Sequence, residues 1–386
     1  MDAKRIYLDH NASAPLHDAA RQTMLDALEA ANPSSVHAEG RSARRIVETA
    51  RRDVAALVNG RAEHVVFTSG ATEAASLLLS PHWIMGRAPL AFSRLYVSAA
   101  EHPCLLSGGR FAAEAVQRIC VKADGTIDLQ SLEHALTNHD RSEGLPLVAV
   151  HAANNETGVI QPTEEIGRIA KRAGAVMIVD AVQAAGRIPL DISSGNADFL
   201  IVSSHKIGGP KGAGAVVAVA DLMMPVPLIT GGGQEKGHRA GTENVPAIAG
   251  FGAAARQAAA GLAQMDAVRS RRNRMETVIR SIVPDAVIYG ERAERLPNTT
   301  FFSIPGMKAE TAQIAFDLAG IALSAGSACS SGKVGPSHVL QAMGFEDQPS
   351  ALRVSLGSQS SDEDIDAFAA TLKTLASRRK EATIAA

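Results

Sequence analysis

The sequence predicts an α/β protein in which a mostly parallel sheet lies between helices. Three observations support this prediction. Short nonpolar segments typical of buried strands alternate along the chain with segments of helical periodicity. The 386 residues exceed what one simple core usually contains, so two domains are expected. Hydrophobic residues make up 46% of the chain and charged residues 20%, as in a soluble globular protein.

Charge and cysteine content narrow the class of protein. The formal net charge is −2 at pH 7, which gives no indication of a nucleic acid or an anionic membrane as partner. No nonpolar run is long enough to cross a bilayer, and residues 1–5 lead into no signal-type segment, so we expect a cytoplasmic protein. Three cysteines are too few for a disulfide framework and are not spaced as a zinc site; we expect no metal and one reactive thiol.

The first part of the chain ends in a candidate anion site. An extended arm is predicted at 1–15, an amphipathic helix at 18–31 and an Arg- and Ala-rich helix at 38–58. A strand at 65–67 is followed by a turn at 68–74 that leads into another helix. Because the free N–H groups of a helix start converge, this turn is predicted to bind an anion, and a phosphate is the expected guest.

Strands and helices then alternate. The predicted segments are strands at 94–98, 146–151, 175–180, 199–202 and 215–220 and a helix at 162–173. Such sheets bind ligands at the carboxyl ends of their strands. The candidate site residues at these ends are Thr72, His102, Asn155, Asp180, Gln183, His205 and Lys206.

The last third of the chain predicts a smaller α+β domain. A glycine-rich segment at 231–241 is followed by a helical stretch at 246–283. Strands are then predicted near 287 and at 299–304.

Lys206 is the strongest candidate for covalent chemistry. It follows a predicted buried strand, beside His205 and among small residues. Removal from water at such a position lowers the pKa of a lysine amine and makes it nucleophilic. The alternative is a lysine in a solvated turn, which is the usual state of an isolated lysine.

Asp180 ends the nonpolar run at 176–179, where a carboxylate needs a positive partner. A protonated pyridine nitrogen is such a partner, and this pairing makes pyridoxal phosphate (PLP) an electron sink. A local arginine or a helix cap is the alternative. With Lys206 downstream in a glycine-rich turn, the arrangement is that of PLP enzymes of fold type I.

A series of short segments extends this match over nearly the whole chain. They are YLD at 7–9 with NA at 11–12, NPSSVH at 32–37, TSGATE at 68–73, EH at 101–102, NNETG at 154–158, DAVQ at 180–183, SSHKIGGPKG at 203–212, RAGT at 239–242, GSAC at 326–329 and LRVSLG at 352–357. In these segments the chain resembles cysteine desulfurases of the NifS/IscS type, in the class V aminotransferase group. It departs from the family pattern at 13–14, 74–75 and 208–209, none of which removes a catalytic group.

The resemblance implies a PLP-dependent transferase fold like that of aspartate aminotransferase. A large PLP-binding domain at 16–258 is expected to contain a mostly parallel seven-stranded sheet between helices. Residues 1–15 and 259–386 are expected to form the small domain, which carries the catalytic cysteine loop. A homodimer is also implied, because Thr242 is expected to act in the other subunit.

The resemblance also implies roles for the residues around the cofactor. Lys206 is expected to bind PLP as a Schiff base, and Asp180 to pair with the ring nitrogen. Gln183 and Asn155 are expected to contact the ring hydroxyl region, and His102 to lie over the ring face and assist proton transfer. The expected phosphate ligands are Thr72, Ser203, His205 and, from the other subunit, Thr242.

The substrate and the sulfur atom have their own expected ligands. Arg353 is expected to hold the carboxylate of L-cysteine as a bidentate fork, with Asn155 beside it. Cys329 lies among small residues at 324–332, so we expect a mobile loop that takes the sulfur as a persulfide and delivers it to acceptor proteins, such as those that assemble iron-sulfur clusters. A small buried cysteine is the alternative. Cys104 and Cys120 are assigned no role.

The predicted function is therefore PLP-dependent cysteine desulfuration, which converts L-cysteine to L-alanine. One alternative is another PLP lyase, for example one that acts on selenocysteine. Another is a non-catalytic scaffold or regulator of sulfur transfer. A dinucleotide-binding oxidoreductase is a third, although the glycines at 231–233 do not join a strand to a helix in the dinucleotide pattern.

Overall fold

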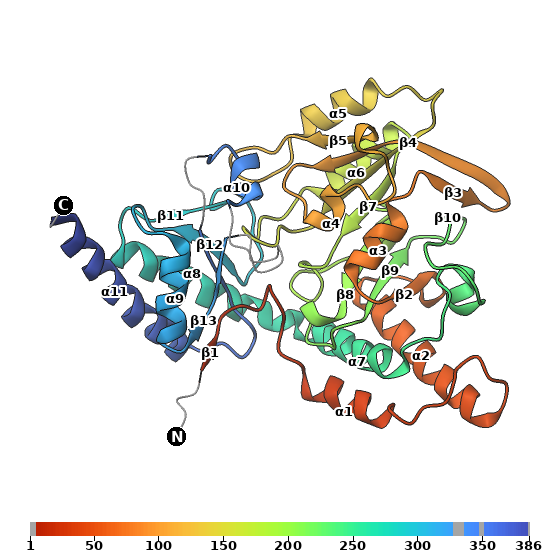
Figure 1. Ribbon diagram of the computed structural model, residues 1–386, viewed down its shortest axis with the longest axis horizontal. Helices are drawn as coiled ribbons and strands as arrows, with labels where there is room; N and C mark the ends of the chain where they lie inside the picture. Colours follow the sequence, from red (N-terminus) through yellow and green to blue (C-terminus); the bar gives the residue numbers. More distant parts are fainter. Residues whose placement is uncertain (1–4, 327–335, 347–350, 385–386) are drawn as a thin grey trace.

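The computed structural model describes residues 5–326, 336–346 and 351–384, which form two groups of elements side by side (Figure 1). The larger group surrounds a sheet that contains seven strands in the order β5-β4-β6-β7-β8-β9-β2. Their bounds are β5 Val116–Ile119, β4 Ala88–Ser98, β6 Leu145–His151, β7 Val176–Asp180, β8 Phe199–Ser203, β9 Gly214–Ala218 and β2 Val65–Thr68. The pairs from β5 to β8 are parallel, and β9 is antiparallel to both of its neighbours. This confirms the predicted mostly parallel sheet.

The sheet has nine strands where seven were predicted. The long strand β4 continues beyond its pairing with β6, and its first residues pair with β3 (His82–Met85), which in turn pairs with β10 (Met223–Pro225). The two additional strands are antiparallel. They therefore extend one end of the predicted sheet without altering its strand order.

Helices cover both faces of the sheet because its strands are nonpolar on both faces. Neighbouring residues of β7 belong to different nonpolar clusters: Val179 packs with one set of helices and Ile178 with the other. The first set is α1 Asp18–Asp26, α2 Ala38–Leu57, α5 Leu129–Thr137, α6 Thr163–Arg172 and α7 Val245–Gly261. The second is α3 Ala71–Leu78 and α4 Pro103–Leu106. Helix α1 ends five residues before the predicted end at residue 31.

The smaller group contains a four-stranded sheet in the order β11-β12-β15-β14. These strands are β11 Val287–Ile288, β12 Thr299–Ser303, β15 Leu352–Ser355 and β14 Ser324–Ala325. The helices of this group are α8 Met265–Ile282, α9 Ala309–Leu318, α10 His338–Ala342 and α11 Asp362–Ile384. Strand β1 (Ile6–Tyr7) of the N-terminal arm pairs with β13 (Ile321–Ala322), so the arm is part of this group. The predicted domain boundary at 258/259 lies in the last turn of α7.

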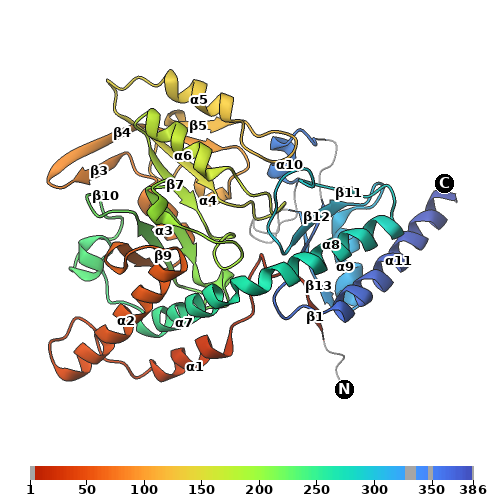
Figure 2. The ribbon, with the colours of Figure 1, turned by 180° about the vertical axis from the view of Figure 1, so that it is seen from behind.

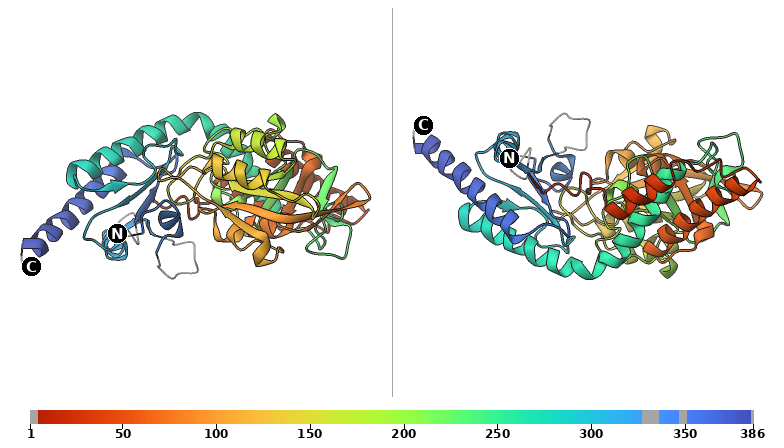
Figure 3. Two further views of the ribbon diagram at one scale, coloured as in Figure 1. Left: turned by 90° about the horizontal axis from the view of Figure 1, so that it is seen from above. Right: turned by 90° about the horizontal axis from the view of Figure 1, so that it is seen from below.

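Helices α7 and α8 join the two groups (Figure 2). The sequence predicts one helical stretch at 246–283, and the structure divides it at a short 3-10 turn, Leu262–Gln264. Seen from above and below, the two helices run from the large sheet to the small one along one side of the molecule (Figure 3).

None of the helices in the described part of the chain has the length and nonpolar character needed to cross a membrane.

Candidate active site

A cavity of about 520 Å³ lies at the carboxyl ends of β6, β7 and β8; we call it the sheet-edge cavity. The parallel register brings these ends together, since His151 of β6 pairs with Asp180 of β7 and Asp180 pairs with Ile201 of β8. The predicted site residues that line it are Thr72, His102, Asn155, Asp180, Gln183, Ser203, His205 and Lys206. The structure therefore gathers eight of the predicted residues around one space.

Lys206 ends a 3-10 turn, Ser204–Lys206, that follows directly from β8. Its amine donates hydrogen bonds to the carbonyl oxygens of Asn11 at 2.8 Å and Ala12 at 2.9 Å, both on the N-terminal arm. The turn is compact around Gly209, where a Cβ atom would lie 2.2 Å from the Ser204 hydroxyl. A bulkier residue at this position would therefore require the Ser204 side chain to move.

Asp180 is buried at the end of β7, and one of its oxygens accepts a hydrogen bond from the backbone N–H of Val182 at 2.9 Å. Burial raises the pKa of the Asp180 carboxyl group, and the nearby Glu101 carboxylate adds to this effect. Among the residues that the structure describes, no lysine or arginine forms an ion pair with Asp180. The buried carboxylate thus lacks the strong cationic partner that such a position usually has.

A second buried acid lies beside Asp180. Glu101 accepts hydrogen bonds from the backbone N–H of His151 at 2.9 Å and from its Nδ1 at 2.7 Å. Burial opposes a charge on the imidazole, but the Glu101 carboxylate outweighs burial and raises the pKa of His151. The sequence analysis did not assign this pair to the site, although its EH segment includes Glu101.

His102 follows Glu101 and is the N-cap of α4. Its Nδ1 accepts a hydrogen bond from the backbone N–H of Cys104 at 3.2 Å and lies 3.1 Å from the Cys104 Sγ. Burial lowers the pKa of His102. Cys104, which was assigned no role from the sequence, also lines the cavity.

The predicted anion turn also lines the cavity, through Ser69, Gly70 and Thr72. Helix α3 starts after Gly70 with no side-chain hydrogen bond at its N-cap, and Thr72 is exposed in its first turn. His205 Nδ1 lies 3.3 Å from the Ser13 hydroxyl. Burial, with the charges of Lys206 and Lys211, lowers the pKa of His205 to about 4, so this side chain is a neutral hydrogen-bonding group at pH 7.

Gln183 and Asn155 are connected through the N-terminal arm. Gln183 Nε2 donates to the carbonyl oxygen of Asn11 at 3.0 Å, the same oxygen that accepts from Lys206. The backbone carbonyl of Asn155 accepts from Asn11 Nδ2 at 3.3 Å. Asn11 therefore contacts the Gln183 side chain and the Asn155 backbone, and sequence reasoning recognised it only as part of a matching segment.

Arg353 lies behind the cavity wall and has 0% exposure. Its Nη1 donates to the Asn155 carbonyl at 3.0 Å, and its Nη2 donates to Asp9 Oδ1 at 2.8 Å and to the Ser324 hydroxyl at 3.1 Å. The guanidinium is thus held in one orientation next to a residue that lines the cavity.

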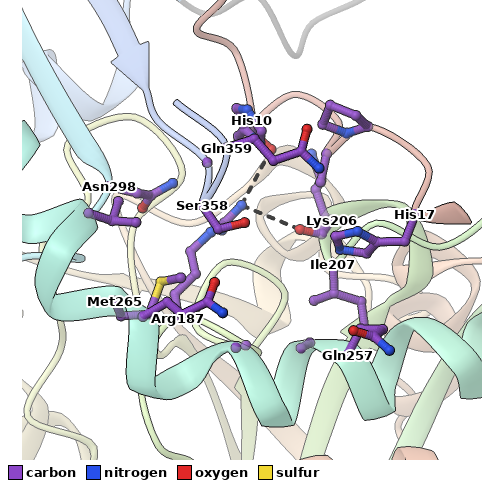
Figure 4. Close-up of a pocket in the computed structure, with 18 of the residues that line it drawn as sticks. His10, His17, Arg187, Lys206, Ile207, Gln257, Met265, Asn298, Ser358 and Gln359 are labelled. Carbon is purple, nitrogen blue, oxygen red and sulfur yellow. Dashed lines mark hydrogen bonds between the residues drawn. The ribbon is translucent and has the colours of Figure 1, made fainter. Parts of the chain in front are cut away.

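A second cavity of about 350 Å³, which we call the rear cavity, also has Lys206 in its lining (Figure 4). Arg187, in its wall, is buried and donates to the carbonyl oxygens of His10 at 3.3 Å and Lys206 at 3.4 Å. It also donates to Gln183, to the backbone oxygen at 2.7 Å and to the side-chain oxygen. Burial, together with the charge of Arg353, lowers the pKa of Arg187 to about 10.

Sequence reasoning missed Arg187. The available signal was its spacing, four residues after Gln183, which places both side chains on one face where the segment is helical. Besides Arg353, two predicted residues are not among those that line the sheet-edge cavity of the described structure. Thr242 is exposed and outside the cavity lining, and Cys329 lies outside the described residues.

The residues of the sheet-edge cavity fit PLP. Asp180, a buried carboxylate without a lysine or arginine partner in the described structure, matches a protonated ring nitrogen. The uncapped start of α3 matches a phosphate group. Lys206 provides the amine for a covalent bond between these two positions.

Comparisons with known proteins agree with this assignment. Residues 6–368 match the family model described as aminotransferase class-V, so the chain belongs to the class V aminotransferase family. A cysteine desulfurase from Frankia sp. is 41% identical over 380 residues, which cover 93% of this chain and 88% of the relative. An IscS-like cysteine desulfurase from Mycobacterium tuberculosis is 36% identical, with 98% of each chain covered. A NifS-like protein structure from Rickettsia africae has a TM-score of 0.85 and 33% identity, and covers 96% of this chain and 99% of its own.

Proposed function

We infer that this protein is a PLP-dependent cysteine desulfurase, which removes sulfur from L-cysteine and releases L-alanine. The observation that carries this conclusion is the meeting of Lys206, Asp180 and the uncapped start of α3 in one cavity of a class V aminotransferase. The relatives named cysteine desulfurase match this chain over almost all of its length.

Each residue around the cavity has a separate role in the reaction. PLP, when bound, stabilises negative charge at the α-carbon of an amino acid. Lys206 takes the α-proton and returns a proton to the carbon that loses sulfur, and its position in the cavity lining supports this role. Asp180 keeps the ring nitrogen protonated, and Gln183 and Asn155 bind beside the ring hydroxyl. The phosphate is bound by the start of α3 with Thr72, Ser203 and His205.

Arg353 binds the substrate carboxylate. Its contacts with Asp9 and Ser324 support this role, because they fix the planar guanidinium in one orientation next to Asn155. A guanidinium in a fixed orientation offers a carboxylate charged N–H groups in one geometry, which the flexible ammonium group of a lysine does not.

Cys329 is the proposed sulfur acceptor, by its match to the family's cysteine segment; it lies outside the described residues. Its thiolate attacks the sulfur of the bound substrate, so that a sulfur–sulfur bond forms while the carbon–sulfur bond breaks. The electron pair of the broken bond stays on carbon, and protonation of this carbon and of the α-carbon completes L-alanine. The sulfur remains on Cys329 as a persulfide and is passed to acceptor proteins.

A homodimer that supplies sulfur to iron-sulfur cluster assembly is the proposed biological form. The exposure of Thr242, away from the cavity of its own chain, supports a role in the other subunit. The name of the M. tuberculosis relative, IscS-like cysteine desulfurase, supports the sulfur-supply role. The cytoplasmic location stays a prediction from the sequence.

The test is alanine release from L-cysteine by the PLP-loaded protein in the presence of a thiol reductant. The wild type is expected to release alanine, whereas Lys206→Ala and Cys329→Ala are expected to lose this activity by about a thousandfold or more, because each removes a reacting group. Cys120→Ser is the matched control, since Cys120 is an exposed cysteine and is expected to keep full activity.

Two outcomes would contradict parts of this function. No alanine from a PLP-loaded wild type would exclude cysteine as substrate, and selenocysteine would be tested next. Undiminished alanine release from L-cysteine by Cys329→Ala would exclude the persulfide step. Consumption of selenocysteine by Cys329→Ala at the wild-type rate would favour a selenocysteine lyase, in which selenium leaves without help from this thiol.

A further inference from the structure

The two ring nitrogens of His102 have different surroundings. Nδ1 accepts a hydrogen bond from the backbone N–H of Cys104 at 3.2 Å and lies 3.1 Å from the sulfur of the same residue. For Nε2, the described part of the chain offers no hydrogen-bond partner, and the ring lines the sheet-edge cavity. Nε2 is therefore the nitrogen available to a bound molecule.

The short helix α4 determines whether Nδ1 carries a proton. Its first residue is Pro103, which has no N–H, so Cys104 contributes the first N–H group of the helix. The side chain of His102, the N-cap, accepts this hydrogen bond through Nδ1. A nitrogen that accepts a hydrogen bond through its lone pair carries no proton, so the hydrogen of the neutral ring is on Nε2.

The Cys104 side chain adds a second donor to the same nitrogen. Burial raises the pKa of the Cys104 thiol, so its sulfur carries a hydrogen at pH 7. At 3.1 Å the sulfur lies within hydrogen-bonding distance of Nδ1, so a protonated thiol can donate to the lone pair of this nitrogen. The alternative, a thiolate that accepts from a protonated Nδ1, conflicts with both the burial of the sulfur and the backbone N–H that already points at Nδ1.

We propose that Cys104 is a positioning residue that holds His102 as the neutral Nε2–H tautomer, so that the nitrogen facing the cavity donates a hydrogen bond and does not accept a proton. Protonation of the ring at Nδ1 would break both contacts with Cys104. His102 then serves as a hydrogen-bond donor over the cofactor, and Lys206 is left as the group that takes the α-proton. This narrows the predicted assistance of His102 in proton transfer.

Charged groups on neighbouring elements act on the imidazole in opposite directions. Asp180 of β7, Glu101 and Glu156 favour a protonated ring, while Lys206 and burial oppose it. Burial is the largest of these effects, and the pKa of His102 is lowered. The contacts at Nδ1 act in the same direction as burial, since they are available only to the neutral ring.

Nitrogen NMR of histidine-labelled protein tests this proposal. Long-range ¹H–¹⁵N correlations distinguish the Nε2–H tautomer, the Nδ1–H tautomer and the imidazolium. They would be recorded on the full-length protein with and without PLP, and His102→Gln would assign the signals. The expected result is the Nε2–H form for His102 between pH 6 and pH 8. This readout does not depend on desulfuration, so its failure and a failure of the proposed function are separate results.

Variants of Cys104 test the contribution of the thiol. Cys104→Ala keeps the backbone N–H but loses the S–H donor, so the pKa of His102 is expected to rise by roughly half to one pH unit, the effect of one ordinary hydrogen bond. Cys104→Ser restores a donor and is expected to return the pKa to the wild-type value. Cys120→Ser, the exposed control, is expected to change nothing.

Two results overturn the proposal. One is an Nδ1–H or imidazolium signal for His102 near pH 7. The other is a His102 pKa that is the same in Cys104→Ala as in the wild type.

Discussion

The two cavities that meet at Lys206 are built in different ways. The sheet-edge cavity is lined by side chains from strand ends and helix starts, among them the buried acid Asp180, and a second buried acid, Glu101, is hydrogen-bonded to the lining residue His151. The rear cavity is formed where α1, the end of α7 and the segment after β15 come together. Its charged centre, Arg187, is bound by oxygen atoms of neutral groups. The first arrangement suits chemistry, and the second holds the Lys206 segment in place.

Asp180→Asn is expected to have the largest effect, because it removes the charge that keeps the cofactor ring protonated. Alanine release should fall by about a thousandfold, or about 4 kcal/mol of activation free energy, while urea unfolding of the cofactor-free protein stays close to that of the wild type. A loss of activity below tenfold would show that Asp180 does not have this role.

Arg187→Ala is expected to act chiefly on stability. The substitution removes the donor that the oxygens of Gln183, His10 and Lys206 share, so the free energy of unfolding should fall by about 2–3 kcal/mol. Arg187→Lys, which keeps a charged donor, should lose about half as much. An Arg187→Ala protein that unfolds like the wild type but has lost its activity would contradict the structural role given to the rear cavity and would indicate a role in the reaction.

Low pH is expected to lower the free energy of unfolding through one histidine in each cavity, and this effect is smaller than those above. Burial, with the charges of Arg187 and His17, lowers the pKa of His10 in the rear cavity to about 4, the value also found for His205. A histidine whose pKa is lower in the folded state contributes stability that is present above pH 6.5 and is lost as the pH falls towards 4.

Urea unfolding at a series of pH values measures this loss. After allowance for solvent screening, the two histidines together are expected to account for a loss on the order of 1–2 kcal/mol. His10→Asn and His205→Asn should each flatten the decline between pH 6.5 and pH 4. A decline unchanged in both variants would assign the acid sensitivity to other groups.

The fold and the sheet-edge cavity were largely predictable because both follow from local patterns. A buried parallel strand is nonpolar throughout, so β7 and β8 are visible in the sequence, and the polar residue at the end of β7, Asp180, marks the ligand edge. Strands β3 and β10 were missed because β3 is mostly exposed and β10 is only three residues long.

Contacts between distant segments could not be predicted in this way. Asn11 reaches Lys206 and Gln183 only because the N-terminal arm crosses from the small sheet to the end of β8. The contact of the Cys104 sulfur with Nδ1 depends on the local geometry of α4, in which His102 is the N-cap and Pro103 is the first residue. Neither the Asn11 contacts nor the Cys104 contact produces a periodic pattern in the sequence from which it could be predicted.

The N-terminal arm has a consequence for substrate choice. Asp9 binds Arg353, while Asn11 and Ala12 bind the Lys206 amine, so a few consecutive backbone units set the separation of the groups proposed to act at the two ends of an amino acid. This separation is independent of the substrate side chain. Under the roles proposed for Arg353 and Lys206, the arm sets the spacing between an amino group and a carboxylate that is found in α-amino acids, and the choice among different side chains rests with other parts of the molecule.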